Sequence, residues 1–403
     1  MAQSNPYVSQ SASGYNASPP PDDGSQSAAN QVAWSKHKTK LADPIKTLSD
    51  GINSAANTAF GTIVNRMEGL IENNLIKNPG FAVAQMGTSF TAATTPANND
   101  DTYTLDQWII LSDGNDTVDV TRVTTPVPTG ARYAIGLDVE TGNRKFGIFQ
   151  PIEAVDSARI VGGTASLQFK ARISGTSLTK LRAAVMAWSS TADTLTSDVV
   201  SAWNVQGTNP TLVANWTYEN TAVDLTTPTT SYQTYTIEGI SIDTASAANV
   251  GVFIWIENTT TTVGDFLYIA DVQLQPGSVA TAYEPRPFAQ ELVLCQRYLE
   301  KSYQLASAPG TVEGLGNMQF VDPIAQGSLG ITYQVLKRLQ SCTMTIYSPA
   351  TGASAVFRDL TSAADVAAST ANRSEHGFTF ECAASHGAAD ESLSFHWVAD
   401  ARL

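Results

Sequence analysis

Carboxylate side chains are abundant in this sequence and are the first groups to weigh for catalysis. A glycoside hydrolase needs two of them facing one sugar bond, with the pKa of one raised by its surroundings. No spacing in the chain singles out such a pair, so we interpret the acids of the central region as solvated or turn-capping groups. These acids are Asp113, Asp116, Glu153, Asp156, Glu238, Asp243, Glu257 and Asp265.

The other residues that commonly take part in chemistry also lack a catalytic pattern. The histidines are His37, His376, His386 and His396, and none stands in an HExxH frame. No GxSxG, GxxxxGK[ST] or GxGxxG element is present. His396 alternates within an apolar strand pattern, which favours packing. We therefore predict no catalytic residues and a protein that is not an enzyme.

Aromatic side chains beside a turn-rich stretch are the best candidates for binding. Trp203, Trp216 and Tyr218 flank the sequence QGTNP at residues 206–210. Exposed aromatic faces stack on pyranose rings, and nearby amides and acids hold the sugar hydroxyls. These three residues are our candidate glycan-binding residues. The alternative is that they cover the edge of a core, as large aromatic residues near loops usually do.

Composition predicts an all-β body and argues against nucleic-acid binding. The chain has 403 residues, too many for one compact core, and only 15% of them are charged. Abundant Thr, Ser, Ala, Asn and Gly are typical of twisted sheets joined by many turns. The formal net charge is −14, and only three lysines occur between Phe81 and Gln290. Such a body would repel a phosphate backbone.

The cysteines and the N-terminus predict where the chain folds. Cys295, Cys342 and Cys382 show no metal-binding spacing and cannot all pair with one another, so we interpret them as reduced core residues. The first residues, MAQSNPYVSQ, contain neither a basic region nor an apolar one, and no stretch approaches the length needed to cross a bilayer. We expect folding in a cytoplasm and no membrane insertion.

The N-terminal region divides into an arm and a helical stem. Residues 1–24 are rich in Ser, Asn, Gln, Tyr and Pro, which predicts either a disordered tail or an extended anchor arm that orders against a partner. Residues 25–73 predict helices, because apolar residues recur every three or four positions after Asp43 and Pro44. We expect this stripe to pack against copies of itself or against the chain's own body. The stripe residues that we assign to oligomerisation are Ile45, Leu48, Ile52, Ala56, Phe60, Ile63, Met67 and Leu70.

From residue 74 onward the apolar pattern has a period of two. Eight strands are predicted at residues 103–111, 132–139, 145–151, 164–173, 180–188, 231–240, 250–256 and 266–274. Strands without intervening helices favour a two-sheet sandwich or jelly roll over residues 74–280. A Pro-rich linker and a helix over 288–302 follow within residues 281–304, and residues 305–403 predict a small β-domain.

Several segments resemble a known class of phage protein. The sequences NLIKNPGF at 74–81 and YIADVQLQPG at 268–277 resemble the first and last strands of carbohydrate-binding-module-like jelly rolls, which pair with each other in those families. The linker AYEPRPF at 282–288, followed by EL at 291–292 and CQRY at 295–298, is similar to bacteriophage tail-fibre and virion-spike proteins. The ending SFHWVADA at 394–401 is similar to their C-termini.

This resemblance implies a fibre or spike subunit of a phage virion, located on the tail or the head, that attaches to a host-surface polysaccharide. The chain would form a homotrimer through its stem, contact other virion proteins through the arm, and leave the cell by lysis. A structural calcium at Asp271 and Asn78 is implied by the resemblance alone; otherwise no cofactor is expected. The alternatives are a purely architectural capsid or tail decoration or base protein, and a polysaccharide depolymerase.

Overall fold

The computed structural model describes residues 73–322, 327–382 and 391–403, and Asn73–Leu403 forms one compact unit. The predicted arm and the apolar stripe of the predicted stem lie outside the described residues. Among the described helices, none is both long and apolar enough to cross a membrane.

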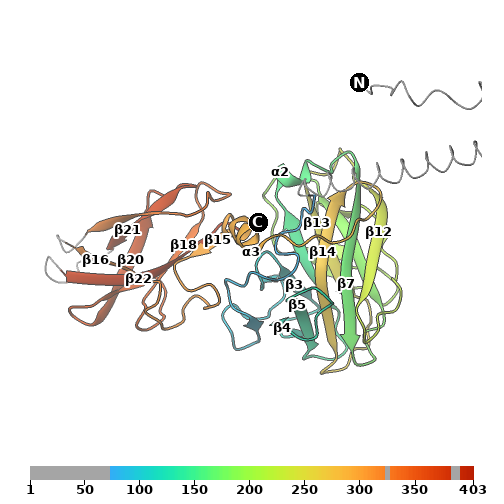
Figure 1. Ribbon diagram of the computed structural model, residues 1–403, viewed down its shortest axis with the longest axis horizontal. Coiled ribbons are helices and arrows are strands. Elements are labelled where there is room, and N and C mark those ends of the chain that lie inside the picture. Colours follow the sequence, from blue (N-terminus) through green and yellow to red (C-terminus); the bar gives the residue numbers. More distant parts are fainter. Residues whose placement is uncertain (1–72, 323–326, 383–390) are drawn as a thin grey trace, which may run out of the picture. The chain divides into compact units, whose positions relative to one another are not determined.

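Two antiparallel sheets of six strands each face one another in the central part of the chain (Figure 1). Strands in the first sheet, sheet A, follow the order β1 (Ser89–Phe90), β4 (Val118–Val123), β5 (Ala134–Val139), β14 (Phe266–Pro276), β7 (Thr164–Ser174) and β12 (Gln233–Ser241). Strands in the second, sheet B, follow the order β11 (Trp216–Tyr218), β8 (Leu181–Trp188), β13 (Asn249–Ile256), β6 (Phe146–Ile152), β3 (Ile109–Ser112) and β2 (Thr102–Tyr103). The predicted mainly β chain with a β-sandwich is confirmed.

Smaller elements connect these strands. β9 (Val200–Ala202) and β10 (Thr211–Leu212) form a two-stranded sheet in the segment between β8 and β11. The helix α2 (Ala154–Ser157) directly follows β6.

The period-two pattern of the sequence explains how the sandwich forms its core. In β7, Leu167, Phe169 and Ala171 are fully buried between the sheets, whereas Lys170 on the opposite face is partly exposed. Burial of one face per strand is what an alternating strand achieves. β13 is apolar on both faces, and both faces are covered. Val250, Val252 and Ile254 lie in the core between the sheets, and Phe253 and Trp255 pack on the outer side of sheet B.

The opening segment of the described chain runs beside β14. The Leu75 amide donates to the Leu274 carbonyl at 2.8 Å, and the Val272 amide donates to the Pro79 carbonyl at 3.1 Å. Leu75 is fully buried in the core between the sheets. The beginning and the end of the sandwich are therefore held together by main-chain hydrogen bonds.

The C-terminal part contains a further sheet with its own core, drawn in orange and red in Figure 1. Phe357, Phe380 and Phe395 are fully buried in that core, and β22 is the central strand because it pairs with β15, β16, β18 and β19. The strands are β15 (Leu299–Lys301), β16 (Met318–Asp322), β17 (Ser328–Thr332), β18 (Thr343–Tyr347), β19 (Val356–Asp359), β20 (Ala364–Ala371), β21 (Gly377–Cys382) and β22 (Glu391–Asp400).

Two predicted elements differ from the structure. The helix predicted over 288–302 is α3 (Phe288–Gln296), because Leu299 already pairs with Asp400 in the sheet. The strand predicted over 103–111 is interrupted by a turn closed by a hydrogen bond from the Trp108 amide to the Leu105 carbonyl, 2.8 Å long. Gln107 has a φ of 69° there, a conformation that does not continue a strand.

The three cysteines lie where the composition predicted. Cys295, Cys342 and Cys382 are buried and free. Burial raises the pKa of the Cys382 thiol to about 12, with the nearby Asp322 carboxylate adding to the shift. A thiol held in the protonated form behaves as a small apolar core residue.

Candidate functional site

The outer face of sheet B carries an aromatic cluster that includes all three predicted glycan-binding residues. Trp216 lies at its centre, with its ring centroid 5.3 Å from Phe149 and 5.4 Å from Trp188. Only 5% of Trp216 is exposed. Its ring faces are therefore covered by neighbouring side chains of the same chain.

Trp203 and Tyr218 lie at the edge of this cluster and are half-buried. The Trp203 ring packs against Phe253 with the centroids 5.9 Å apart, and the Tyr218 ring lies 6.3 Å from that of Trp255. The Tyr218 hydroxyl donates to the Pro210 carbonyl at 2.9 Å, and burial raises its pKa. These contacts correspond to the second reading of the sequence, in which the aromatic residues cover a core edge.

A buried ionic network fixes the segment that covers this face. Glu257 is fully buried and accepts hydrogen bonds from Lys145 at 2.8 Å, from the Gly207 amide at 3.1 Å and from the Trp255 indole at 3.0 Å. Arg182 donates to Asn209 on the same segment at 2.6 Å. Both oxygens of Glu257 are occupied by protein donors, so this carboxylate serves the packing of the loop.

The two residues of the calcium hypothesis are each engaged with protein groups. The Asn78 side chain is fully buried, where its amide donates to the Val83 and Asp106 carbonyls and its oxygen accepts from the Val83 amide. Asp271 accepts from the Lys170 ammonium at 2.8 Å. In the described part of the chain, no group of three or more His, Cys, Asp or Glu residues is arranged to hold a metal ion.

Asp271 owes its position to a bulge in β14. The register of β14 against β7 shifts between Ala270 and Gln273, and Asp271 has a φ of 52°. Phe81 has a φ of 54° in the adjacent opening segment, an unusual conformation for a bulky residue. Bulges beside binding sites commonly redirect a side chain, and left-handed residues concentrate where the surrounding structure enforces them.

The bulge borders a cavity of about 610 Å³, which we call the Asp271 cavity. Its wall includes Asp271 and Lys170 from sheet A, Tyr133 from the end of the loop before β5, and Tyr283 and Phe288 from the linker. Phe288 is 48% exposed, so its ring is available to a ligand. The cavity combines aromatic surface with a charged pair that can both donate and accept hydrogen bonds.

The linker motif forms part of this wall and fastens it to the sandwich. Arg286 donates to the Ile76 carbonyl and to the Glu291 carboxylate, both at 2.9 Å, and also to the Asn74 carbonyl. Glu291 in turn accepts from the Asn78 amide. The motif that the sequence singled out therefore clamps the opening segment of the sandwich.

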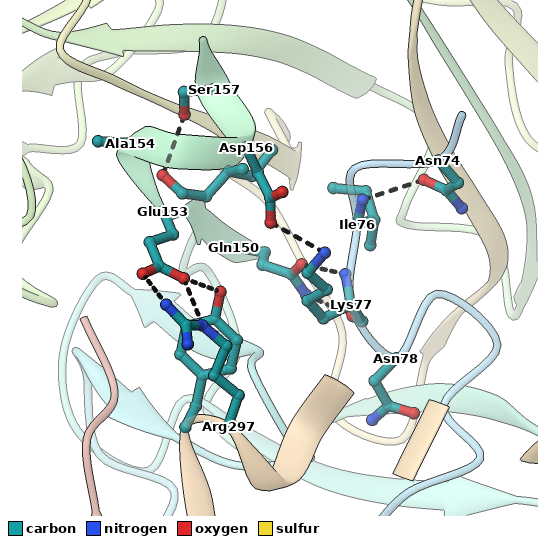
Figure 2. Close-up of polar contacts among 12 residues, drawn as sticks. Asn74, Ile76, Lys77, Asn78, Gln150, Glu153, Ala154, Asp156, Ser157 and Arg297 are labelled. Atoms are coloured by element: carbon teal, nitrogen blue, oxygen red, sulfur yellow. Dashed lines mark hydrogen bonds and ion pairs between the residues drawn. The ribbon is translucent and has the colours of Figure 1, made fainter. Parts of the chain in front are cut away.

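A second clamp lies at the far end of α3 (Figure 2). Arg297 donates to both carboxylate oxygens of Glu153, and hydrogen bonding to Glu153 raises the pKa of Arg297. Lys77 of the opening segment forms an ion pair with Asp156 at 3.0 Å, and its backbone exchanges hydrogen bonds with the Gln150 side chain (Figure 2). The linker is thus joined to the sandwich at both ends of its helix.

His396 is packed inside the C-terminal part. It is fully buried, its ring stacks on Tyr303 with the centroids 3.7 Å apart, and its ring nitrogens contact the Ser302 hydroxyl and the Glu313 carbonyl at 3.0 Å each. Burial lowers the pKa of its imidazole. These contacts agree with the packing role expected from the alternating pattern.

No pattern in the sequence groups the residues of the Asp271 cavity. Asp271 was predicted as a strand residue and a possible calcium ligand, Tyr283 and Phe288 as parts of the linker motif, and Tyr133 and Lys170 as residues within predicted strands. These residues lie between positions 133 and 288 of the sequence, too far apart for a local sequence pattern to show that they are close in space. The one usable clue was the linker motif, whose residues close one side of the cavity.

Comparison with known proteins gives no family for this chain. The sequence matches no protein-family model and no curated protein. Solved structures with a similar fold include a phage tailspike domain and carbohydrate-binding modules.

The structural matches are partial. The enzymatically active domain of bacteriophage CBA120 tailspike protein 4 is 15% identical, with a TM-score of 0.30, and the match covers 50% of this chain but only 21% of the tailspike chain. The C-terminal family 22 carbohydrate-binding module of Clostridium thermocellum Xyn10B is 11% identical, with a TM-score of 0.28 and coverages of 45% and 94%. A family 16 carbohydrate-binding module is 14% identical, with a TM-score of 0.24 and coverages of 38% and 84%. Identities and TM-scores this low carry no argument about function.

Proposed function

We propose that this chain is a non-enzymatic fibre or spike subunit of a bacteriophage virion and that its sandwich binds a host-surface glycan in the Asp271 cavity. One observation carries the binding proposal: Tyr283 and Phe288 offer aromatic surface in the same cavity in which the Lys170–Asp271 pair offers a donor and an acceptor. Sugar sites in proteins combine these two features, because pyranose rings have apolar faces and polar edges.

The virion part of the proposal depends on the resemblance of the linker and of the C-terminal sequence to phage fibre and spike proteins. We propose a homotrimer held by the stem residues between Ile45 and Leu70, with the arm of residues 1–24 contacting another virion protein. Weak single-site contacts with a glycan would then be strengthened by three copies on one axis. Such a subunit would be assembled in the host cytoplasm and released by lysis.

The architectural alternative has a specific observation in its favour. The aromatic cluster on the outer face of sheet B is covered by the segment between β8 and β11, with Trp216 5% exposed. A sandwich that serves only as a spacer would need no open binding surface. Glycan binding at the Asp271 cavity separates this alternative from our proposal.

The test is binding of the full-length chain to an array of bacterial surface polysaccharides. We expect retention on at least one glycan, and we expect Phe288→Ala and Lys170→Ala to weaken it about tenfold each. Lys180→Ala is the matched control, because Lys180, directly before β8, pairs with Asp224 and does not line the cavity. Phe288 is exposed, so Phe288→Ala should fold normally. Lys170→Ala leaves Asp271 without its ion-pair partner and can therefore lower stability.

Three outcomes would contradict the proposal. Absence of binding to every glycan, or binding that neither cavity variant weakens, would favour the architectural role or a different site. Release of new reducing ends from a bound polysaccharide would show a depolymerase and overturn the non-enzymatic assignment.

A further inference from the structure

Two guanidinium groups without a carboxylate partner lie against Tyr133, whose side chain lines the Asp271 cavity. The guanidinium carbon of Arg122 lies 4.4 Å from the centroid of the Tyr133 ring, and that of Arg132 lies 5.4 Å from it. Arg122 also donates to the Ala82 carbonyl at 2.9 Å, and Arg132 donates to the Tyr133 hydroxyl at 3.0 Å. Within residues 73–322, 327–382 and 391–403, no Asp or Glu forms an ion pair with either arginine.

This arrangement differs from that of several other cations in the sandwich, although Arg172 likewise lies over the rings of Tyr232 and Tyr268 and forms no ion pair among the described residues. Lys77, Lys145 and Arg182 each lie within 3.0 Å of a carboxylate oxygen. In a chain with a net charge of −14, acidic partners are plentiful. Two arginines that contact Tyr133 and form no ion pair leave positive charge beside the cavity, which an anion from outside the chain can use.

The remaining charges of the cavity cancel in pairs. Lys170 lies 2.8 Å from Asp271, and Arg286 lies 2.9 Å from Glu291. Of the residues that line the cavity, Arg132 is thus the cation left without a counter-charge, and its side chain is exposed. The cavity carries a net positive charge on an otherwise acidic protein.

The stacking on Tyr133 also prepares Arg132 for a planar anion. The Nε–H of Arg132 is used by the Tyr133 hydroxyl, which leaves the two terminal NH2 groups of the guanidinium to face the two oxygens of a carboxylate. The ring limits the rotamers that the arginine can adopt, so less conformational entropy is lost when the anion binds.

We infer that the Asp271 cavity recognises a carboxylate-bearing sugar, a uronic acid residue of an acidic polysaccharide, with its carboxylate at Arg132 and its ring beside Phe288. This inference depends on the proposed glycan binding and narrows it to one chemical class. The Lys170–Asp271 pair then faces the hydroxyl groups of the sugar. Arg122 adds positive potential behind Tyr133 without lining the cavity itself.

The experiment is calorimetric titration of the full-length chain with defined polymers. Polygalacturonate, alginate and hyaluronate present uronate carboxylates, methyl-esterified polygalacturonate presents the same backbone without the charge, and phosphomannan presents phosphate instead. We expect at least one uronate polymer to bind, and we expect esterification to weaken that binding at least tenfold. Arg132→Gln should weaken binding of the acid polymer about tenfold, the loss of one charge-assisted hydrogen bond.

Arg144→Gln is the matched control, because it removes the same charge from a partly exposed arginine that does not line the cavity. Equal affinity for acid and ester, an unchanged affinity of the Arg132→Gln variant, or tighter binding of phosphomannan than of every uronate polymer would each overturn the uronate assignment. In those cases, glycan binding lost in Phe288→Ala would leave the proposed function standing. If the chain bound none of these polymers and no polysaccharide on the array, both the uronate assignment and the proposed glycan binding would be wrong.

Discussion

The guanidinium of Arg297 forms two hydrogen bonds with the carboxylate of Glu153, 2.9 Å and 2.6 Å long. The Tyr298 hydroxyl donates to the same carboxylate at 2.9 Å. Glu153 directly precedes α2, and Arg297 directly follows α3. One buried carboxylate of the sandwich therefore holds the end of the linker from which β15 begins.

Replacing this carboxylate should destabilise the chain measurably. Glu153→Gln keeps the size of the side chain but removes its charge, and hydrogen bonds to charged groups contribute about 1.5–3 kcal/mol. We expect the free energy of unfolding, measured by urea titration, to fall by about 2 kcal/mol. As a control, Lys180→Gln breaks the solvent-exposed Lys180–Asp224 pair and should cost less than about 1 kcal/mol. Equal effects of the two changes would show that the Glu153 clamp contributes no more than a surface ion pair.

The stability of the sandwich should respond to pH through Asp101. Burial raises the pKa of Asp101 from 3.8 to about 7, and the charges of Asp100 and Asp198 add to the shift. An acid with a raised folded-state pKa binds more protons in the folded than in the unfolded chain. Its contribution to stability is therefore present below pH 3.8 and is lost as the pH rises towards 7.

Asp101→Asn isolates this effect, because asparagine tolerates the φ of 59° found at this position. We expect the melting temperature of the variant to exceed that of the native chain by a margin that grows from pH 4 to about pH 7. Glu284→Gln removes an exposed carboxylate and serves as the control. A margin that stays constant over this range would contradict the pKa shift.

Trp216 should matter for stability far more than for binding. Trp216→Ala empties a site at the centre of the outer aromatic cluster, and such truncations cost about 3–5 kcal/mol. Val205→Ala on the covering segment should change the free energy of unfolding by less than about 0.5 kcal/mol, since Val205 is 73% exposed. If Trp216→Ala hardly changed the free energy of unfolding but abolished glycan binding, the glycan site would lie on the outer face of sheet B and not in the Asp271 cavity.

The homotrimer can be tested by mass. We expect light scattering to give the mass of three chains for the full-length protein and of one chain for a version that starts at Asn73. This result would assign self-association to the first 72 residues, which contain the stripe from Ile45 to Leu70. A full-length monomer would refute the stem as an oligomerisation element.

Strands with a clear hydrophobic pattern could be predicted from the sequence. Residues 250–256 are apolar on both faces, and β13 is covered on both faces in the structure. The same reasoning overextended the helix at 288–302, because Leu299 is apolar in a helical pattern as well as in β15, and pairing with Asp400 decides between them. Tertiary pairing overrides a local pattern in such short segments.

The candidate site could not be read from the sequence, because it depends on one bulge. The left-handed Asp271 lies where the ladder of β14 against β7 slips, and nothing in the sequence around it distinguishes it from a regular strand residue. Sequence reasoning also could not tell that Trp216 faces other side chains and that Phe288 faces solvent. Both questions depend on which loops fold back over which sheet.

The most direct test of the account is a crystal structure of the chain with an oligosaccharide from a polymer that it binds. We predict sugar density in the Asp271 cavity, with a ring beside Phe288 and hydroxyl groups within hydrogen-bond distance of Lys170 and Asp271. Density over Trp203 and Tyr218 on the outer face of sheet B, with the Asp271 cavity empty, would contradict the central claim.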